Sequence, residues 1–300
     1  MKRLGALLVL ASLIVLLVAC PSPQGEVGTE IISADEALGL LNDGNVVLVD
    51  ARNLLDYRKG HVEGAVSVSR ADIVVNEPYP NLLAPGEQIA AVMSERGIGN
   101  DTLVVAYDDN SNMDAARLWF TLKAYGHDAV KVVSGGLTAL RAGGATETTV
   151  APSVQAASFT AGPLESEMIA TLSEVRAQVN DPDPKTVLVD TRTVEEYSEG
   201  TIPGSICLDY AGNNFSDGTY KPPRQIQIRY IEAGVDFDNT VIMYCKTSIR
   251  GAQTYLALYD AGYRDLKLYD AAWVEWSANP MNEIYVPEGT TIQIEASDVS

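Results

Sequence analysis

The sequence predicts an α/β protein of two similar domains, each with a mostly parallel β-sheet flanked by helices on both faces. Three observations predict this class: an internal repeat, apolar strand segments that alternate with helical segments, and a stretch poor in charge between the two copies. Strands buried on both faces are unbroken apolar runs, because the helices that connect them cover both faces of the sheet. The 300 residues are enough for two domains of ordinary size.

The chain contains the same pattern twice. Residues 46–66 (VVLVDARNLLDYRKGHVEGAV) match residues 186–206 (TVLVDTRTVEEYSEGTIPGSI), with each position 140 residues from its counterpart. Residues 101–136 match residues 239–272 at a separation near 137, and loops of different length explain the change. A repeat of this length indicates two copies of one structural unit.

The repeat predicts the domain boundaries. We expect an N-terminal domain over 31–147 and a C-terminal domain over 164–278. The stretch between them, 148–163, contains Pro, Ser and Ala with little charge and is predicted to be a linker. A tail over 279–300 follows the second copy.

Each copy is predicted to begin with a helix and a buried strand. In the first copy Ser33 is the expected N-cap and Glu36 completes a capping box, before the apolar strand VVLVD. A second strand (TLVVAY or TVIMY), a helix and a third strand (AVKVV or LKLY) follow. Asp108 and Cys245 come directly after the second strand of their copies, at the sheet edge where α/β proteins place their chemistry.

The composition argues against two classes of partner. The formal net charge is −19, so a nucleic-acid backbone is not an expected ligand, because it requires a positive surface. The two histidines, His61 and His127, belong to no ligand pair. We therefore expect no metal and no cofactor.

The N-terminal segment is predicted to be a bacterial lipoprotein signal peptide over 1–20. Lys2 and Arg3 precede an apolar run, and the segment LVAC, which ends at Cys20, looks like a lipobox. Cleavage before Cys20 and lipid attachment to its thiol would anchor the protein outside the cytoplasmic membrane. An uncleaved anchor helix is the alternative, and residues 21–30 are expected to be a short tether.

The segment VIMYCKTSIRG gives Cys245 a chemical role. A loop between a strand end and a helix N-terminus directs backbone N–H groups into one concavity, and the helix dipole adds positive potential. Lys246 and Arg250 add cationic charge, so the thiol is expected to ionise readily and act as a nucleophile. Cys207, in GSICLDY, is expected to be a small buried residue; a disulfide between Cys207 and Cys245 is permitted outside the cytoplasm, but no spacing indicates one.

These motifs resemble the tandem-domain rhodaneses, the thiosulfate and 3-mercaptopyruvate sulfurtransferases. The resemblance covers both copies and rests on LVDAR, LVDTR, IPGSI, VIMYCKTSIRG and YDAAWVEW. It implies that Cys245 forms a persulfide and that Asp108 replaces the cysteine lost from the first domain. It also implies a six-residue active loop whose other members are Lys246, Thr247, Ser248, Ile249 and Arg250.

The spacing Cys-x4-Arg favours sulfur transfer over phosphate chemistry. Cysteine phosphatases use Cys-x5-Arg, a wider loop, whereas Arg250 lies five positions after Cys245. We expect a sulfane sulfur to move from an anionic donor such as thiosulfate, through Cys245, to cyanide or a thiol. A persulfide carrier without turnover and a 3-mercaptopyruvate sulfurtransferase are the alternatives.

Three further residues bear on this expectation. Asp190 and Arg192 are predicted to be a structural pair that supports the loop. Glu196 stands where thiosulfate-type relatives often have a basic residue, which weighs against a preference for thiosulfate. The loop also differs from the Cys-Gly-Ser-Gly loop of mercaptopyruvate enzymes.

Overall fold

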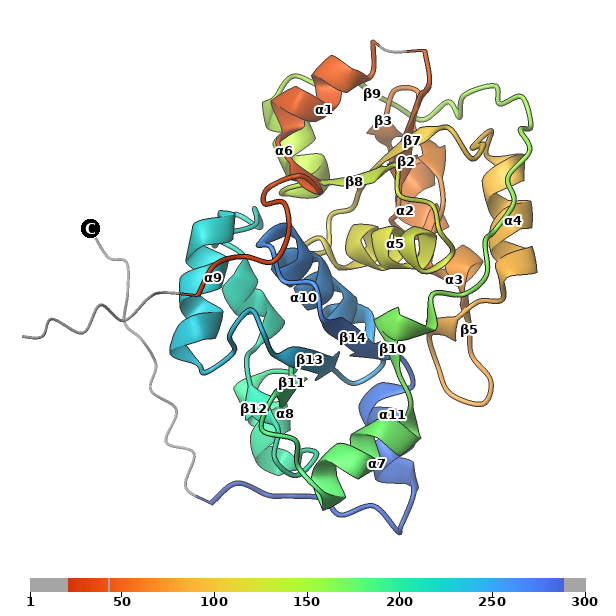
Figure 1. The fold of residues 1–300 in the computed structure, drawn as a ribbon. Coiled ribbons are helices and arrows are strands. Elements are labelled where there is room, and N and C mark those ends of the chain that lie inside the picture. The colour runs from red at the N-terminus through yellow and green to blue at the C-terminus, as the bar shows by residue number, and fades with distance from the viewer. Residues whose placement is uncertain (1–20, 43, 289–300) are drawn as a thin grey trace, which may run out of the picture.

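The computed structural model describes residues 21–42 and 44–288. The predicted signal peptide with Cys20, the predicted site of lipid attachment, and the last part of the predicted tail lie outside the described residues. The described chain forms two α/β domains, which occupy the upper and lower parts of Figure 1. Each has a five-stranded sheet in which every neighbouring pair is parallel, so the predicted fold class is confirmed.

The N-terminal domain has the strand order β1-β8-β7-β2-β4. Two short antiparallel pairs, β3 with β9 and β5 with β6, lie outside this sheet. Its elements are β1 (Ile31–Ile32), α1 (Ala34–Leu40), β2 (Val46–Asp50), α2 (Leu54–Lys59), β3 (His61–Val62), β4 (Val66–Ser67), α3 (Arg70–Ile73), β5 (Val74–Val75), β6 (Leu82–Leu83), α4 (Gly86–Glu95), β7 (Leu103–Tyr107), α5 (Met113–Ala124), β8 (Val130–Val133), α6 (Gly136–Ala142) and β9 (Glu147–Thr148).

The C-terminal domain has the equivalent strand order, β10-β14-β13-β11-β12. Its elements are η1 (Ser166–Met168), β10 (Ile169–Ala170), α7 (Leu172–Asn180), β11 (Thr186–Asp190), α8 (Val194–Glu199), β12 (Ile206–Cys207), η2 (Tyr210–Asn213), α9 (Pro223–Glu232), β13 (Thr240–Tyr244), α10 (Ile249–Asp260), β14 (Leu266–Tyr269) and α11 (Ala272–Ala278).

Capping boxes begin the first helix of each domain. In α1 the Ser33 hydroxyl accepts from the Glu36 N–H at 3.2 Å, and the Glu36 carboxylate accepts from the Ser33 N–H at 2.8 Å, as predicted. Thr171 and Glu174 make the same two bonds at 3.2 and 2.7 Å in α7. Each box satisfies two backbone donors at a helix start, and its recurrence shows that local structure repeats along with the sequence.

The two domains share one hydrophobic core. Apolar residues on one face of each sheet pack with α5 and α10, and buried residues of both helices belong to a single cluster that includes Trp119, Phe120 and Tyr255. In Figure 1 α5 and α10 lie next to each other where the domains meet. The opposite faces are covered separately, by α1 and α6 in the first domain and by α7 and α11 in the second.

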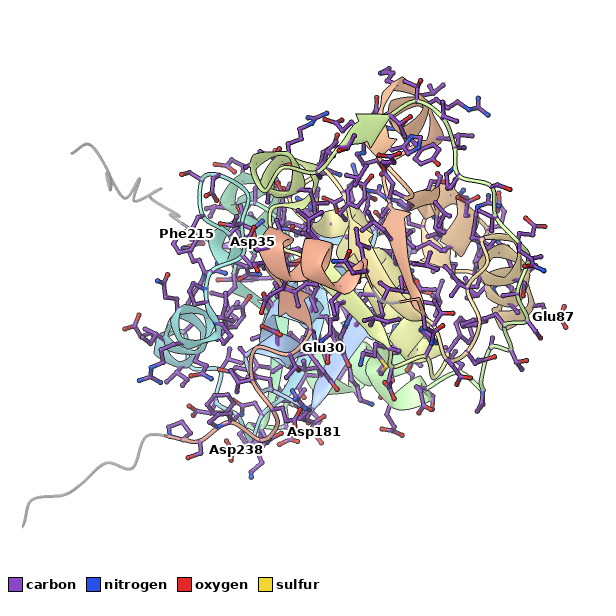
Figure 2. All side chains as sticks on the ribbon, turned by 90° about the horizontal axis from the view of Figure 1, so that it is seen from above. Glu30, Asp35, Glu87, Asp181, Phe215 and Asp238 are labelled. Atoms are coloured by element: carbon purple, nitrogen blue, oxygen red, sulfur yellow. The ribbon has the colours of Figure 1, made fainter. Side chains whose placement is uncertain are left out.

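The N-terminal segment crosses to the far domain before it enters the first sheet. The Gln24 and Gly25 N–H groups donate to the Gly262 carbonyl at 3.0 and 3.1 Å, and the Glu30 and Ile31 N–H groups donate to Asp260 Oδ1 at 2.7 and 3.1 Å. Residues 24–31, most of which belong to the short tether predicted over 21–30, therefore form a strap that is docked on the C-terminal domain. Glu30, labelled in Figure 2, accepts a hydrogen bond from Trp119 Nε1 at 2.9 Å.

The linker and the start of the tail also pack on the domains. Phe159 is buried in the shared core, and its N–H donates to Ser94 Oγ at 3.0 Å. In the tail Tyr285 forms an antiparallel bridge with Thr201, at the place where β9 pairs with β3 in the first domain. Residues 279–288 thus contact the C-terminal domain in the way that the end of the first copy contacts its own domain.

Candidate functional site

Cys245 lies at the carboxyl end of β13, immediately before α10. The turn ends at Ser248, the N-cap of α10, whose φ of 64° lies in the left-handed region that non-glycine residues rarely adopt. The Trp273 and Val274 N–H groups donate to the carbonyls of Cys245 and Lys246 at 3.0 and 3.2 Å. The start of α11 therefore holds the outer side of the loop, and Cys245 is only 1% exposed.

The loop directs unused backbone donors toward its interior. Among the described residues, the N–H groups of residues 246–251 donate to no acceptor. These groups include the first turn of α10, whose donors have no partner within the helix. A cluster of such donors at a helix N-terminus attracts negative charge.

The equivalent loop of the first domain contains a carboxylate in this position. Asp108 follows β7, and its two oxygens accept from four N–H groups, at 2.8–3.0 Å: those of Asn110, Asn112, Asp114 and Ala115. Burial raises the pKa of Asp108 to about 6, although the amide bonds act in the opposite direction. Asp108 thus occupies the amide cradle of its own loop.

The two loops differ in length as well as in chemistry. Residues 108–112 separate β7 from α5, whereas only residues 245–248 separate β13 from α10. The longer loop has two left-handed residues, Ser111 and Asn112, with φ of 55° and 64°. The loop around Cys245 is therefore the tighter one.

Arg250 is held by Glu196. Its two terminal nitrogens donate to the two carboxylate oxygens at 2.5 and 2.9 Å, and the side chains are 17% and 30% exposed. Burial alone would lower the pKa of Arg250, but the Glu196 hydrogen bond and the nearby Cys245 raise it above its ordinary value. The same hydrogen bond lowers the pKa of Glu196.

Asp190 and Arg192 form a buried ion pair beside the loop. Arg192 Nη2 donates to Asp190 Oδ2 and to the Gly200 carbonyl, both at 2.6 Å. The guanidinium carbon lies 4.4 Å from the centroid of a Trp273 ring. This arrangement fits the predicted supporting pair, whose role in activity stays a prediction.

A cleft of about 340 Å³ opens next to the loop. Its lining comes from α8 and the residues that flank it, from the loop and from α11, and consists of Arg192, Glu196, Glu199, Gly200, Lys246 and Trp273. Lys246 is exposed, and among the described residues its ammonium has no ion-pair or hydrogen-bond partner. The cleft gives a small molecule a route to the neighbourhood of Cys245.

The hydroxyls of the loop are engaged with the surrounding protein. The buried Ser248 hydroxyl has two acceptors within reach of its single hydrogen, the Thr247 carbonyl at 2.7 Å and Asp270 Oδ1 at 3.1 Å. Thr247 Oγ1 accepts from Asn81 Nδ2 at 3.0 Å. Ile249 is buried, and these three residues hold the shape of the loop.

The first domain reaches this loop through Arg117. Arg117, on α5, is fully buried and donates through Nη2 to Asp270 Oδ1 at 2.8 Å and to the Asn81 carbonyl at 3.0 Å. Asp270 also accepts the Leu83 N–H at 2.7 Å. The domain without the cysteine thus contacts Thr247 directly through Asn81 and supports Ser248 indirectly through Asp270.

Sequence reasoning did not identify Asn81, Arg117 or Asp270 as site residues. Asp270 lies in the YDAAWVEW motif, which offered a signal, but Asn81 and Arg117 come from the other domain and need the docked structure. Cys207 is half-buried in β12, is a free thiol like Cys245, and has its pKa raised to about 12, mainly by burial. Within 21–42 and 44–288, no three His, Cys, Asp or Glu residues are grouped as a metal site.

Fold and loop together define a class: duplicated α/β proteins with a cysteine at the carboxyl end of a central strand. The rhodanese-like domain family matches residues 33–142 and 171–279. These segments make up most of the chain, which therefore belongs to this family.

Sequence relatives agree with this assignment. A Mycobacterium bovis protein named "Putative thiosulfate sulfurtransferase 1" is 29% identical over 267 residues, which cover 83% of this chain and 94% of the relative. A Haloferax volcanii protein named "Putative thiosulfate sulfurtransferase" is 29% identical over 237 residues, with 73% and 81% covered. Family and names favour a sulfurtransferase-like enzyme.

Two solved structures have a fold similar to that of this chain. The wild-type structure of EanB has a TM-score of 0.78 and 20% identity, with 87% of this chain and 70% of that chain covered. The anaerobic ergothioneine biosynthesis enzyme from Chlorobium limicola, in complex with its natural substrate trimethyl histidine, has a TM-score of 0.77 and 21% identity, with 87% and 71% covered. At these identities the likeness concerns the fold alone.

Proposed function

We propose that this protein transfers a sulfane sulfur from an anionic donor to a thiophilic acceptor through a persulfide on Cys245. One observation carries the proposal: the amide cradle that Asp108 fills with a carboxylate in the first domain has no acceptor among the described residues around Cys245. A cradle that holds a carboxylate in one copy suits a persulfide anion in the other.

The proposed reaction has two displacement steps. The Cys245 thiolate attacks the outer sulfur of the donor, a new S–S bond forms, and the donor's own bond to that sulfur breaks. With thiosulfate the leaving group is sulfite, which keeps the electron pair. Cyanide or a thiolate then attacks the outer sulfur of the persulfide and restores the Cys245 thiolate, so no outside oxidant or reductant is needed.

The loop residues divide into two groups in this proposal. The backbone N–H groups of residues 246–251 stabilise the persulfide charge, and Lys246 attracts the donor. Thr247, Ser248 and Ile249 keep the loop closed through their contacts with Asn81, Asp270 and the core. The tight turn before α10 favours a single sulfur over a tetrahedral phosphate.

A persulfide carrier without turnover is the second candidate. The 1% exposure of Cys245 favours it, because an acceptor must reach a nearly buried sulfur. Multiple-turnover formation of thiocyanate from a sulfane donor and cyanide separates the two: turnover supports the enzyme, and a stable persulfide without turnover supports the carrier.

The mass of the intact protein tests the proposal directly. After incubation with thiosulfate, or with cysteine persulfide, we expect a gain of one sulfur on Cys245 that cyanide removes. The Cys245→Ala variant is expected to gain none, whereas Cys207→Ala should behave as the wild type. No gain on Cys245 with either donor would contradict both the enzyme and the carrier.

We also propose that a lipid on Cys20 anchors the protein outside the cytoplasmic membrane of a bacterium. The charged start, the apolar run and LVAC of residues 1–20 support this proposal. Incorporation of labelled fatty acid by the wild type, and its loss in Cys20→Ala, would support it; a Cys20→Ala variant that stays membrane-bound and labelled would contradict it.

A further inference from the structure

Three cationic side chains of the C-terminal domain lie in or beside the Cys245 loop in the part of the chain that the structure describes, and two of them are neutralised by carboxylates. Arg192 is paired with Asp190 at 2.6 Å, and Arg250 is paired with Glu196 at 2.5 and 2.9 Å. Only Lys246 has no carboxylate partner among the described residues. An incoming anion therefore meets one available positive charge.

The Glu196–Arg250 pair is held in place from both sides. Glu196 is the third residue of α8, and its carboxylate also accepts the Thr193 N–H at 3.2 Å as part of a capping box. The Arg250 guanidinium lies 5.8 Å from the Tyr210 ring centroid. Bidentate charge-assisted bonds between partly buried groups are among the stronger polar contacts, so a donor must compete with Glu196 for Arg250.

The charge of the donor decides how severe this competition is. Thiosulfate is a dianion and approaches a thiolate on a protein whose formal net charge is −19. A persulfide of a zwitterionic thiol has one net negative charge. Because Lys246 is the only unpaired cation of the loop within 21–42 and 44–288, the dianion is the less well compensated of the two donors.

We propose that Glu196 is a specificity-determining positioning residue, which withholds Arg250 from the donor and so favours sulfane donors of single negative charge over thiosulfate. This inference rests on the proposed function. In the favoured reaction the Cys245 thiolate attacks the outer sulfur of a persulfide RSS⁻, the S–S bond of the donor breaks, and the thiolate RS⁻ leaves with the electron pair.

The test compares two donors in a Glu196→Gln variant. Glutamine keeps an acceptor for the capping bond of α8 but releases the charge of Arg250. We expect the KM for thiosulfate to fall about tenfold, the scale of one charge-assisted hydrogen bond, with kcat little changed. The kcat/KM for cysteine persulfide should stay within about twofold of the wild type.

Two further variants distinguish the release of Arg250 from a general change in the negative charge near the loop. Glu195→Gln removes one negative charge from the same helix without contact to Arg250, and we expect only a small change in the KM for thiosulfate. In the double variant Glu196→Gln/Arg250→Gln the gain should disappear, because the released guanidinium is absent.

The inference would be overturned by either of two results. An equal loss of kcat/KM for both donors in Glu196→Gln would make the pair a structural brace. An equal gain in Glu195→Gln and Glu196→Gln would make the effect one of net charge. A failure of the proposed function gives a different result: Cys245 then gains no sulfur from either donor in any variant.

Discussion

The loops that follow β7 and β13 occupy equivalent places in the two domains. They differ in whether their backbone N–H groups have an acceptor. Around Asp108 four N–H groups are occupied by the protein's own carboxylate. Around Cys245 the equivalent donors have no acceptor among the described residues. The donors of the first loop are therefore occupied by a side chain of the protein, whereas those of the second are suited to bind and release an anion.

The comparison also explains why a domain without a cysteine is useful to the protein. Its helix α5 presents Arg117 to Asp270, and Asp270 accepts the hydroxyl of Ser248 in the other domain's loop. Ser248 has a left-handed backbone, which costs free energy unless its surroundings hold it. The first domain, through α5, thus provides a fixed support for the loop around Cys245.

Removal of the nucleophile should have the largest effect. We expect Cys245→Ser to lower sulfur transfer by about a thousandfold or more, because no other residue of the loop or of the cleft beside it carries a thiol. Thiocyanate formation at saturating donor measures this loss. If the variant retained more than a few per cent of the activity, Cys245 would not be the nucleophile, and the second loop would not differ from the first in the way proposed.

Loss of the support from the first domain should rank next. Arg117→Met leaves Asp270 charged and largely buried, so we expect the free energy of unfolding to fall by about 3–5 kcal/mol. Persulfide formation should slow as well, and Arg117→Lys should recover part of the rate because it retains the charge. Chemical denaturation and single-turnover mass analysis report these two quantities.

A matched control tests whether the position of Arg117 matters. Arg70 pairs with Asp114 in the same domain, but its side chain is 34% exposed. Arg70→Met should therefore cost less than about 1 kcal/mol and leave persulfide formation unchanged. Equal effects of the two variants would mean that Arg117 has no special connection to the loop.

Removal of the Asp108 carboxylate from the first loop should have a smaller effect on stability. Asp108→Ala deprives four N–H groups of their acceptor, and we expect a loss of about 1–3 kcal/mol of stability at pH 7.5. Added sulfate should restore part of the thermal stability by binding the emptied cradle. Asp109→Ala, which changes the exposed neighbour, serves as the control; an Asp108→Ala protein as stable as this control would contradict the role of the carboxylate.

The smallest expected effect is on the dependence of stability on pH in acid. Because Arg250 lowers the pKa of Glu196, the folded state holds this proton more weakly than the unfolded state. The pair therefore contributes stability above the ordinary pKa of a glutamate, and the contribution is lost as the pH falls through the lowered value. We expect a term of about 1 kcal/mol or less, seen as a shallower acid dependence of unfolding in Glu196→Gln than in the wild type.

Much of the fold follows from local sequence. The unbroken apolar segments VVLVD and TVIMY became central strands, and Ser33 with Glu36 became the first capping box, because strand burial and helix capping depend on near neighbours. The internal repeat then gave both domains the same order of elements. The repeat also identified Asp108 and Cys245 as equivalent positions from the sequence alone.

The contacts between domains were not predictable in the same way. Arg117 lies on a helix that is buried on all sides, and nothing in its neighbourhood in the sequence names Asp270 as its partner. Similarly, Pro and Gly in residues 21–30 predicted a tether, although Asp260 holds the backbone of Glu30 and Ile31. Such contacts join residues far apart in the chain, so local patterns do not specify them.

The strap over residues 24–31 limits how the two halves can move. Besides the shared core, the linker attaches the two domains on one side, and the strap ties the start of the first domain to Asp260 and Gly262 of the second. Two separate attachments leave a hinge little freedom to swing. The contact between Asn81 and Thr247 should therefore persist through every turnover, and exchange of domains between molecules would first require the strap to detach.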